Sequence, residues 1–164
     1  MMLEELFAGL ENLLSRQRDA VKALCAGTEK QIGVIRDADT DALTTLAQEQ
    51  LGLVSELAML DQERLNTLSA LGTALGLKRN VTLRELLSAA SEDRRTRLAS
   101  LEDALDADLA ALRKLNSVCR AMVKQGLQFS TQMLTAVGLA GTDTYGVGGE
   151  VPQALTVRAV DSTV

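Results

Sequence analysis

Residues 98–122 read LASLEDALDADLAALRKLNSVCRAM, and the spacing of their apolar side chains decides the fold class. Leucine, cysteine or methionine recurs every three or four residues: Leu98, Leu101, Leu105, Leu109, Leu112, Leu115, Cys119 and Met122. This spacing places the apolar side chains on one side of an α-helix, whereas a half-buried strand would alternate with period two. We predict a long amphipathic helix that begins after Ser91 and continues to Val137. The helix should end at Gly138 or Gly141.

The same spacing predicts further helices on the N-terminal side of this stretch. A first long helix covers about residues 3–35 and stops at a cluster of polar side chains. Asp39 or Thr40 can cap a second long helix, because a side-chain oxygen there accepts from the free N–H groups of the first turn. The second helix should end near Gly76, since glycine readily adopts the left-handed conformation that often follows a helix.

We also predict a short helix over about residues 83–90, because Thr82 and Glu85 have the spacing of a capping box at its start. Long helices joined by short links pack against one another in opposite directions. We therefore predict an all-α fold: an elongated antiparallel bundle of three long helices plus one short helix over residues 1–138. The glycine-rich residues 139–164 are expected to form a flexible C-terminal tail.

Composition argues against an enzyme. The 164 residues include many leucines and alanines, which are strong helix formers, but no histidine and no tryptophan. Without histidine the chain lacks the usual acid–base catalyst and the usual partner of a nucleophilic serine or cysteine. The carboxylates Glu102, Asp103, Asp106 and Asp108 cluster in sequence but have no matching metal ligands, and acids between apolar positions usually form a solvated face. We expect no catalytic residue, no metal and no cofactor.

Net charge, apolar runs and cysteines limit the classes of partner and the cellular location that we expect. Seventeen basic and 22 acidic residues give a net charge of −5, which disfavours a nucleic-acid partner. No apolar run approaches the roughly 20 residues that span a bilayer, and the acidic N-terminus does not resemble a signal peptide. Cys25 and Cys119 have no metal or redox spacing, so we expect two buried free thiols in a reducing cytoplasm. The basic group Arg94, Arg95 and Arg97 either meets an acidic partner or keeps the first helical turns solvated.

Residues 125–142 contain no charged side chain, although 24% of the whole chain is charged. On a helix, two neighbouring apolar rows run through this segment and give an apolar arc of about 160°. The arc could pack in the bundle's own core, against a second copy, or against another chain. A wide apolar face usually belongs to a core, but adaptable Met and Leu side chains with uncharged borders suit a partner helix. The candidate partner-binding residues on this helix are Met122, Val123, Leu127, Phe129, Met133, Leu134 and Val137.

The pattern of the whole chain resembles that of the FlgN family of flagellar export chaperones. The matching stretches are IRDADTDALTTLAQEQ (35–50), LDQER (60–64), VTLRELL (81–87), LRKLN (112–116) with the long helix after it, and TYGVGG (144–149). Their order and spacing cover nearly all of the chain up to the tail. One position departs from the family, in which a second asparagine often follows three residues after Asn116, where this chain has Cys119.

The resemblance implies a cytoplasmic, helical, non-enzymatic chaperone of flagellar type III protein export. Such proteins bind the C-terminal helices of the hook–filament junction proteins FlgK and FlgL, prevent their premature assembly, and deliver them to the flagellar export gate. It also implies that the C-terminal part of the chaperone contacts the substrate. Tyr145 matches the family's tyrosine near the end of the ordered chain, which we associate with docking at the export gate.

A second hypothesis comes from a different class of protein. The same apolar rows would also suit a self-assembling coiled-coil structural subunit of a secretion apparatus, in which the C-terminal helix pairs with its own copies. A homo-oligomer is therefore possible under either hypothesis. A chaperone would remain a small oligomer at any concentration, whereas a structural subunit would lengthen as the concentration rises.

Overall fold

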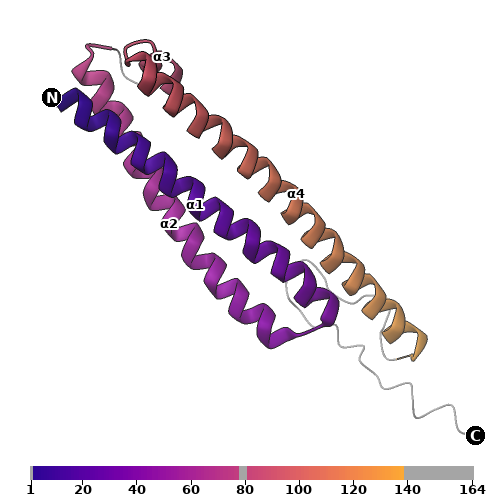
Figure 1. Cartoon of the computed structure of the whole chain (residues 1–164). Helices are drawn as coiled ribbons and strands as arrows, with labels where there is room; N and C mark the ends of the chain where they lie inside the picture. Colours follow the sequence, from indigo (N-terminus) through magenta and orange to yellow (C-terminus); the bar gives the residue numbers. More distant parts are fainter. Residues whose placement is uncertain (1, 78–80, 139–164) are drawn as a thin grey trace, which may run out of the picture. The chain divides into compact units, whose positions relative to one another are not determined.

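The structure, a computed structural model, describes residues 2–77 and 81–138, and within these ranges the regular secondary structure is all α-helix (Figure 1). Its helices are α1 (Met2–Asp37), α2 (Thr40–Ala74), α3 (Leu83–Leu87) and α4 (Glu92–Ala136). The prediction of three long helices and one short helix is confirmed. The expected flexible tail, residues 139–164, lies outside the described residues.

The chain divides into two compact units, Met1–Cys119 and Arg120–Val164, and the boundary falls within α4. The first unit holds α1, α2, α3 and the beginning of α4. The second unit, as far as it is described, is the remainder of α4 with the residues that end it. The division at residue 138 that the sequence favoured stays a prediction.

Short polar signals set the ends of α1 and α2. Ala38 has φ +56° and turns the chain between the two helices. Asp39 then caps α2, because its side chain accepts a hydrogen bond of 3.0 Å from the backbone N–H of Ala42. At the other end of α2, Gly76 has φ +68°, a conformation that glycine adopts without a steric penalty. Asp39 and Gly76 thus act as their positions in the sequence predicted.

Helix α3 begins with the predicted capping box but is shorter than expected. The backbone N–H of Thr82 donates to Glu85 Oε2 at 2.8 Å, and the N–H of Glu85 donates back to Thr82 Oγ1 at 3.4 Å. The backbone N–H and the hydroxyl of Thr82 both donate to the Glu85 carboxylate, and these two hydrogen bonds lower the pKa of Glu85. The helix ends at Leu87 instead of Ala90, because Arg95 of α4 donates to the carbonyl oxygens of both residues and holds the chain in a tighter turn.

The core of the first unit is densest where α3 lies. Its buried members come from all four helices and the turn after α3: Phe7, Leu10, Leu14, Val21, Leu71, Leu83, Leu86, Ala90, Leu98 and Leu105. Near the α1–α2 turn the corresponding apolar residues, such as Ile35 and Leu43, are only half-buried. Four helices meet at one end of this unit, and the additional wall that α3 supplies there excludes water more completely.

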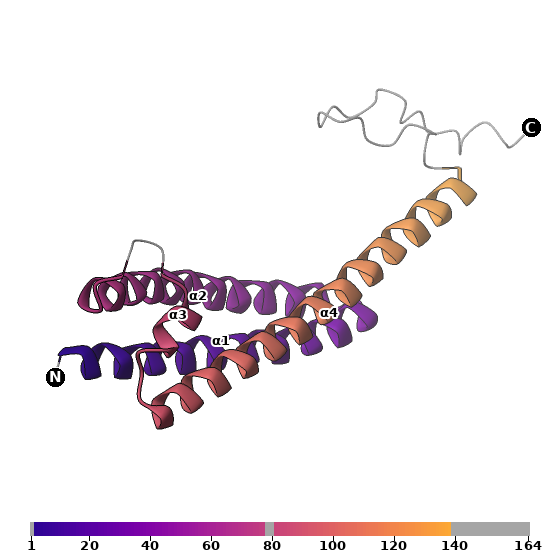
Figure 2. The same ribbon diagram turned by 90° about the horizontal axis from the view of Figure 1, so that it is seen from above.

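Consecutive long helices run in opposite directions within the first unit. Figures 1 and 2 show α1 and α2 side by side, with α3 near the end where α1 begins and α2 ends. The beginning of α4 runs parallel to α1, since their contacts follow the same order along both helices. Arg94 Nη2 lies 2.9 Å from Glu4 Oε2, and further along Cys119 Sγ contacts the carbonyl oxygen of Thr28 at 3.9 Å.

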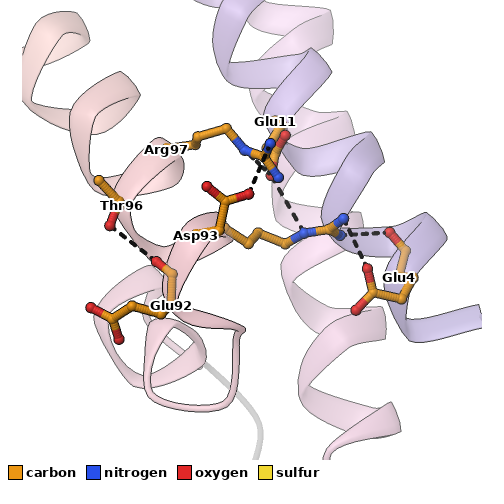
Figure 3. Close-up of polar contacts among 7 residues, drawn as sticks. Glu4, Glu11, Glu92, Asp93, Thr96 and Arg97 are labelled. Atoms are coloured by element: carbon orange, nitrogen blue, oxygen red, sulfur yellow. Dashed lines mark hydrogen bonds and ion pairs between the residues drawn. The ribbon is translucent and has the colours of Figure 1, made fainter.

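A cluster of charged side chains fixes the start of α4 to α1. Arg94, whose side chain is only 14% exposed, donates a 2.8 Å hydrogen bond to the carbonyl oxygen of Glu4 and lies 3.5 Å from Glu11 Oε1. Its guanidinium also lies 5.8 Å from the centre of the Phe7 ring. Arg97 approaches the same Glu11 oxygen at 3.7 Å (Figure 3). Arg94 and Arg97 therefore have acidic partners on α1 of the same chain, whereas Arg95 pairs with Glu92 of α4 itself.

Two polar residues in the apolar row of α1 are also buried. Thr28 donates to the carbonyl oxygen of Leu24 at 2.8 Å and accepts from the Gln50 side chain at 3.2 Å. Gln17 is 5% exposed, and among the described residues its Oε1 has no hydrogen-bond partner. Both positions continue the three–four spacing of the apolar row of α1, and both side chains are buried.

The two cysteines are free thiols with different burial. Cys119 is buried, as predicted, whereas Cys25 is half-buried, so the prediction was wrong for Cys25. Cys25 lies at the edge of the apolar face of α1, where its Sγ contacts the carbonyl oxygen of Asp108 at 3.7 Å. Burial raises the pKa of both thiols, and the negative charges of Asp108 and Glu29 raise that of Cys25 further.

Replacing Arg94 with methionine should destabilise the fold by about 1–3 kcal/mol, because it leaves Glu11 and the Glu4 carbonyl with fewer donors in a partly buried site. Chemical denaturation followed by circular dichroism would measure this. Arg16→Met is the matched control, since Arg16 and Glu63 are half-exposed and 4.0 Å apart, and it should cost about 0.5 kcal/mol or less. Equal losses in the two variants would contradict a special role for Arg94.

The thiols should alkylate more slowly in the folded protein than in the unfolded chain. A raised pKa leaves less thiolate at pH 8, and the thiolate is the form that reacts with iodoacetamide. Mass spectrometry of timed samples, with and without guanidinium, would give the rate at each cysteine. We expect the larger protection at Cys119. A folded-state rate at Cys119 equal to the unfolded rate would show that α4 does not stay packed on α1 at Thr28.

Candidate functional site

The candidate site is the C-terminal part of α4. The helix continues through Arg120 to Ala136, and the N–H of Val137 still donates to the Met133 carbonyl oxygen at 3.1 Å. Gly138, with φ +71°, ends the helix by donating to the carbonyl oxygen of Thr135 at 3.0 Å. The predicted end of the helix at Gly138 is confirmed.

Most of the predicted partner-binding side chains are exposed in this segment. Their exposed fractions lie between 46% and 66%: Val123, Leu127, Phe129, Met133, Leu134 and Val137. Met122 is half-buried, and Tyr145 lies outside the described residues. The role of these apolar rows, in a core or at a partner contact, stays a prediction.

The exposed side chains form two rows along one side of the helix. Met122, Phe129 and Met133 belong to the first row, and Leu127 and Leu134 to the second, each with helical spacing. Gly126 falls within the first row, and a Cβ built there would meet nothing within 4 Å. A partner side chain could thus approach the backbone of α4 closely at Gly126.

The two threonines of this segment donate their hydroxyl hydrogen bonds within the helix itself. The Thr131 hydroxyl donates to the Leu127 carbonyl oxygen, and the Thr135 hydroxyl to that of Thr131, each at 2.9 Å. From Gln125 to Gly138 no side chain is charged. A helix that docks here would bury apolar surface without removing water from an ion, which is the costly part of many interfaces.

The acidic cluster considered from the sequence does not form a separate site. Asp108 Oδ2 lies 2.9 Å from Arg18 Nε, so this carboxylate is paired across α1 and α4. Among the described residues no group of three or more cysteines and carboxylates is arranged to hold a metal ion. Crossing a bilayer would take a longer apolar helix than any in the described part of the chain.

One exposed apolar row escaped the sequence analysis. Leu51, Val54 and Leu65 of α2 are each at least half-exposed and lie on its outer side. The inward leucine row of α2 has the stronger three–four spacing and masks this weaker row in the sequence. A search for a second row with the same three–four spacing would have found it.

This geometry defines a class of protein: an all-α protein whose last long helix carries an exposed, uncharged apolar face. The comparison with known families gives the particular assignment. The family described as FlgN protein matches residues 1–153, and the chain belongs to the FlgN family. This membership indicates a flagellar export chaperone. No curated protein and no solved structure matches the chain.

Exposure of the α4 rows leads to a prediction about stability. Leu127→Asp should change the free energy of unfolding by less than about 1 kcal/mol, because Leu127 is 66% exposed. Leu98→Ala, on the same helix but fully buried, should cost about 2–5 kcal/mol. Urea unfolding would compare the two variants. A large loss from Leu127→Asp would mean that Leu127 belongs to a core.

Proposed function

We propose that this protein is a cytoplasmic chaperone of flagellar type III export that binds the C-terminal helices of the hook–filament junction proteins FlgK and FlgL. It holds them unassembled and delivers them to the flagellar export gate. The observation that carries the proposal is the exposed, uncharged double row of α4, together with membership in the FlgN family. The proposed partner surface comprises Met122, Val123, Leu127, Phe129, Met133, Leu134 and Val137.

The binding mode follows from the chemistry of this face. An amphipathic helix docks by inserting side chains spaced three and four residues apart, and the α4 rows offer the same spacing. Full burial of one large apolar side chain contributes about 1.5–3 kcal/mol, so a few of them suffice for a stable complex. The face that the junction proteins would use for assembly is then covered. This role needs no catalysis, metal or cofactor.

Delivery to the export gate is a separate part of the proposal. We assign it to Tyr145, which the family resemblance connects with gate docking. Binding of the substrate through α4 and docking through Tyr145 would use different residues. A Tyr145→Ala variant would then retain FlgK and FlgL while losing contact with the gate.

The direct test is co-purification of the chain with FlgK and FlgL. We expect stoichiometric complexes with the full-length proteins and none with versions that lack their C-terminal helices. Leu127→Asp should weaken binding at least about tenfold, because a carboxylate would have to be buried without a partner. Gln128→Asp is the matched control, since it adds the same charge one residue further on, outside the apolar arc, and should bind normally.

Two outcomes would contradict the proposal. Equal binding by the Leu127→Asp and Gln128→Asp variants would exclude the α4 face as the contact. Failure of the unaltered chain to bind either junction protein, combined with assemblies whose mass rises continuously with concentration, would favour the structural coiled-coil subunit. Light scattering after size-exclusion chromatography would measure that mass over a range of concentrations.

A further inference from the structure

Charge is unevenly distributed along the chain, and its sign changes within α4. Residues 1–108 contain 12 basic and 19 acidic side chains, a net charge of −7, whereas residues 109–138 contain four basic side chains and no acidic one. Two of these four, Arg120 and Lys124, lie in the second unit at the start of the exposed apolar face. A chain with a net charge of −5 thus carries a local positive charge beside its candidate binding surface.

Helix α4 itself offers Arg120 and Lys124 no acidic neighbour. Both side chains are exposed, and among the described residues neither takes part in an ion pair. On a helix surface, ion pairs join residues three or four apart, and no acidic residue has that spacing from either cation. The two cations are instead four residues from each other, a spacing at which like charges repel. Lys124 also lies about three turns before the end of α4 at Ala136, too far for the helix dipole to stabilise it.

Both cations border the second apolar row of the α4 face. At 100° per residue, Arg120 lies about 20° and Lys124 about 60° around the helix from Leu127. Arg120 stands seven residues before Leu127, about two turns, and so continues the second row toward its N-terminal end. The opposite border of the face is formed by Gln125 and Gln132, which are uncharged. The positive charge is therefore confined to one border and one end of the face.

This arrangement selects the charge of a helix that docks on the two rows. Such a helix buries its apolar side and carries polar side chains along both borders of that side. Carboxylates on the border that meets Arg120 and Lys124 would be attracted and would relieve the repulsion between the two cations, whereas lysine or arginine there would be repelled. The long stems of Arg120 and Lys124 reach beyond the rows while their charged groups stay in water, so this contact buries no ion.

A membrane surface is a poorer match for the same residues. A helix that lies on a membrane is rich in lysine and arginine along its polar side, whereas the polar residues from Gln125 to Gly138 are only Gln, Ser and Thr. The net charge of −5 would also oppose binding to anionic lipids. The observations therefore favour a protein helix as the occupant.

We propose that Arg120 and Lys124 bind the carboxylates of an acidic partner helix. The occupant is an amphipathic helix with Asp or Glu side chains on one border of its apolar side, docked so that these carboxylates meet the two cations. This inference rests on the function proposed above and adds the charge of the partner. Ion pairs at such a rim mainly raise the association rate and fix the position of the partner along α4. Selection among helices of equal charge still depends on the apolar rows.

Association rates of two variants with equal net charge test the basic pair. The first carries Arg120→Gln and Lys124→Gln. The matched control carries Lys22→Gln and Lys30→Gln on α1, two exposed lysines that take part in no ion pair among the described residues. With immobilised full-length FlgK or FlgL, we expect the first variant to associate at least about fivefold more slowly than the control at about 0.1 M sodium chloride. The difference should vanish at about 1 M, where the Debye length falls from about 10 Å to about 3 Å.

Charge exchange between the two proteins identifies the partner carboxylate. The full chain with Arg120→Glu and Lys124→Glu should bind at least about tenfold more weakly at about 0.1 M salt while keeping its helical circular dichroism. Each Asp and Glu in the C-terminal helices of FlgK and FlgL is then changed to Lys in turn. At least one of these changes should restore binding to the reversed chain at least about tenfold and weaken binding to the unaltered chain. Restoration by none of them would overturn the inference.

The remaining outcomes separate this inference from the function on which it rests. Equal association rates of the two glutamine variants at low salt, with FlgK and FlgL still bound, would overturn the inference and leave the proposed function standing. Failure of the unaltered chain to bind either protein would overturn both. Sedimentation of the unaltered chain with phosphatidylserine vesicles, lost in the variant with Arg120→Gln and Lys124→Gln, would assign the basic pair to a membrane surface and would also overturn the inference.

Discussion

The packing of α3 against the beginning of α1 and the end of α2 is the constraint on which the first unit depends. Leu86 is fully buried there with Phe7, Leu71 and Leu98, so each of the four helices supplies one wall of the same core. The chain has two phenylalanines and no tryptophan, and it cannot fill a large core with aromatic rings. A short helix that closes one end of the core therefore contributes more to the burial of apolar side chains than its five residues would suggest.

The capping box and Arg95 hold this short helix in place. Thr82 and Glu85 satisfy free N–H groups at its start. Arg95 of α4 donates hydrogen bonds to carbonyl oxygens at and just after its end. Arg94, one residue earlier, attaches the same turn of α4 to α1. Neighbouring side chains of α4 thereby connect α3 and α1, and they set the parallel direction of α1 and the beginning of α4.

The sequence predicted the helices well because their signals are local. Three–four spacing, the Asp39 cap, the capping box at Thr82 and the left-handed Gly138 all act within a few residues. The partner of Arg94 could not be found in this way, because Glu4 lies 90 residues away and is one of many surface acids. Periodicity shows that a side of a helix is apolar. It does not show which element, if any, covers that side.

The candidate site illustrates the same limit. The absence of charge from Gln125 onward was visible in the sequence, but the exposure of residues such as Leu127 was not. The exposed apolar row of α2, formed by Leu51, Val54 and Leu65, was missed because a helix with two apolar sides has a sequence pattern like that of a helix with one broad apolar side. Only the burial of Leu60 beside the exposure of Leu51 separates the two faces.

An uncharged face has consequences for how a chaperone of this family selects and releases its substrate. Without ions at the contact, specificity has to come from the shape and register of the side chains, not from charge pairing. Gly126 and Phe129, a gap and a large ring within one row, provide such a shape. Flexible side chains such as Met133 adapt to more than one helix, so a face of this kind would suit the two partners proposed above better than a rigid surface would. Release needs only a competing apolar face, because there is no buried ion pair to rehydrate.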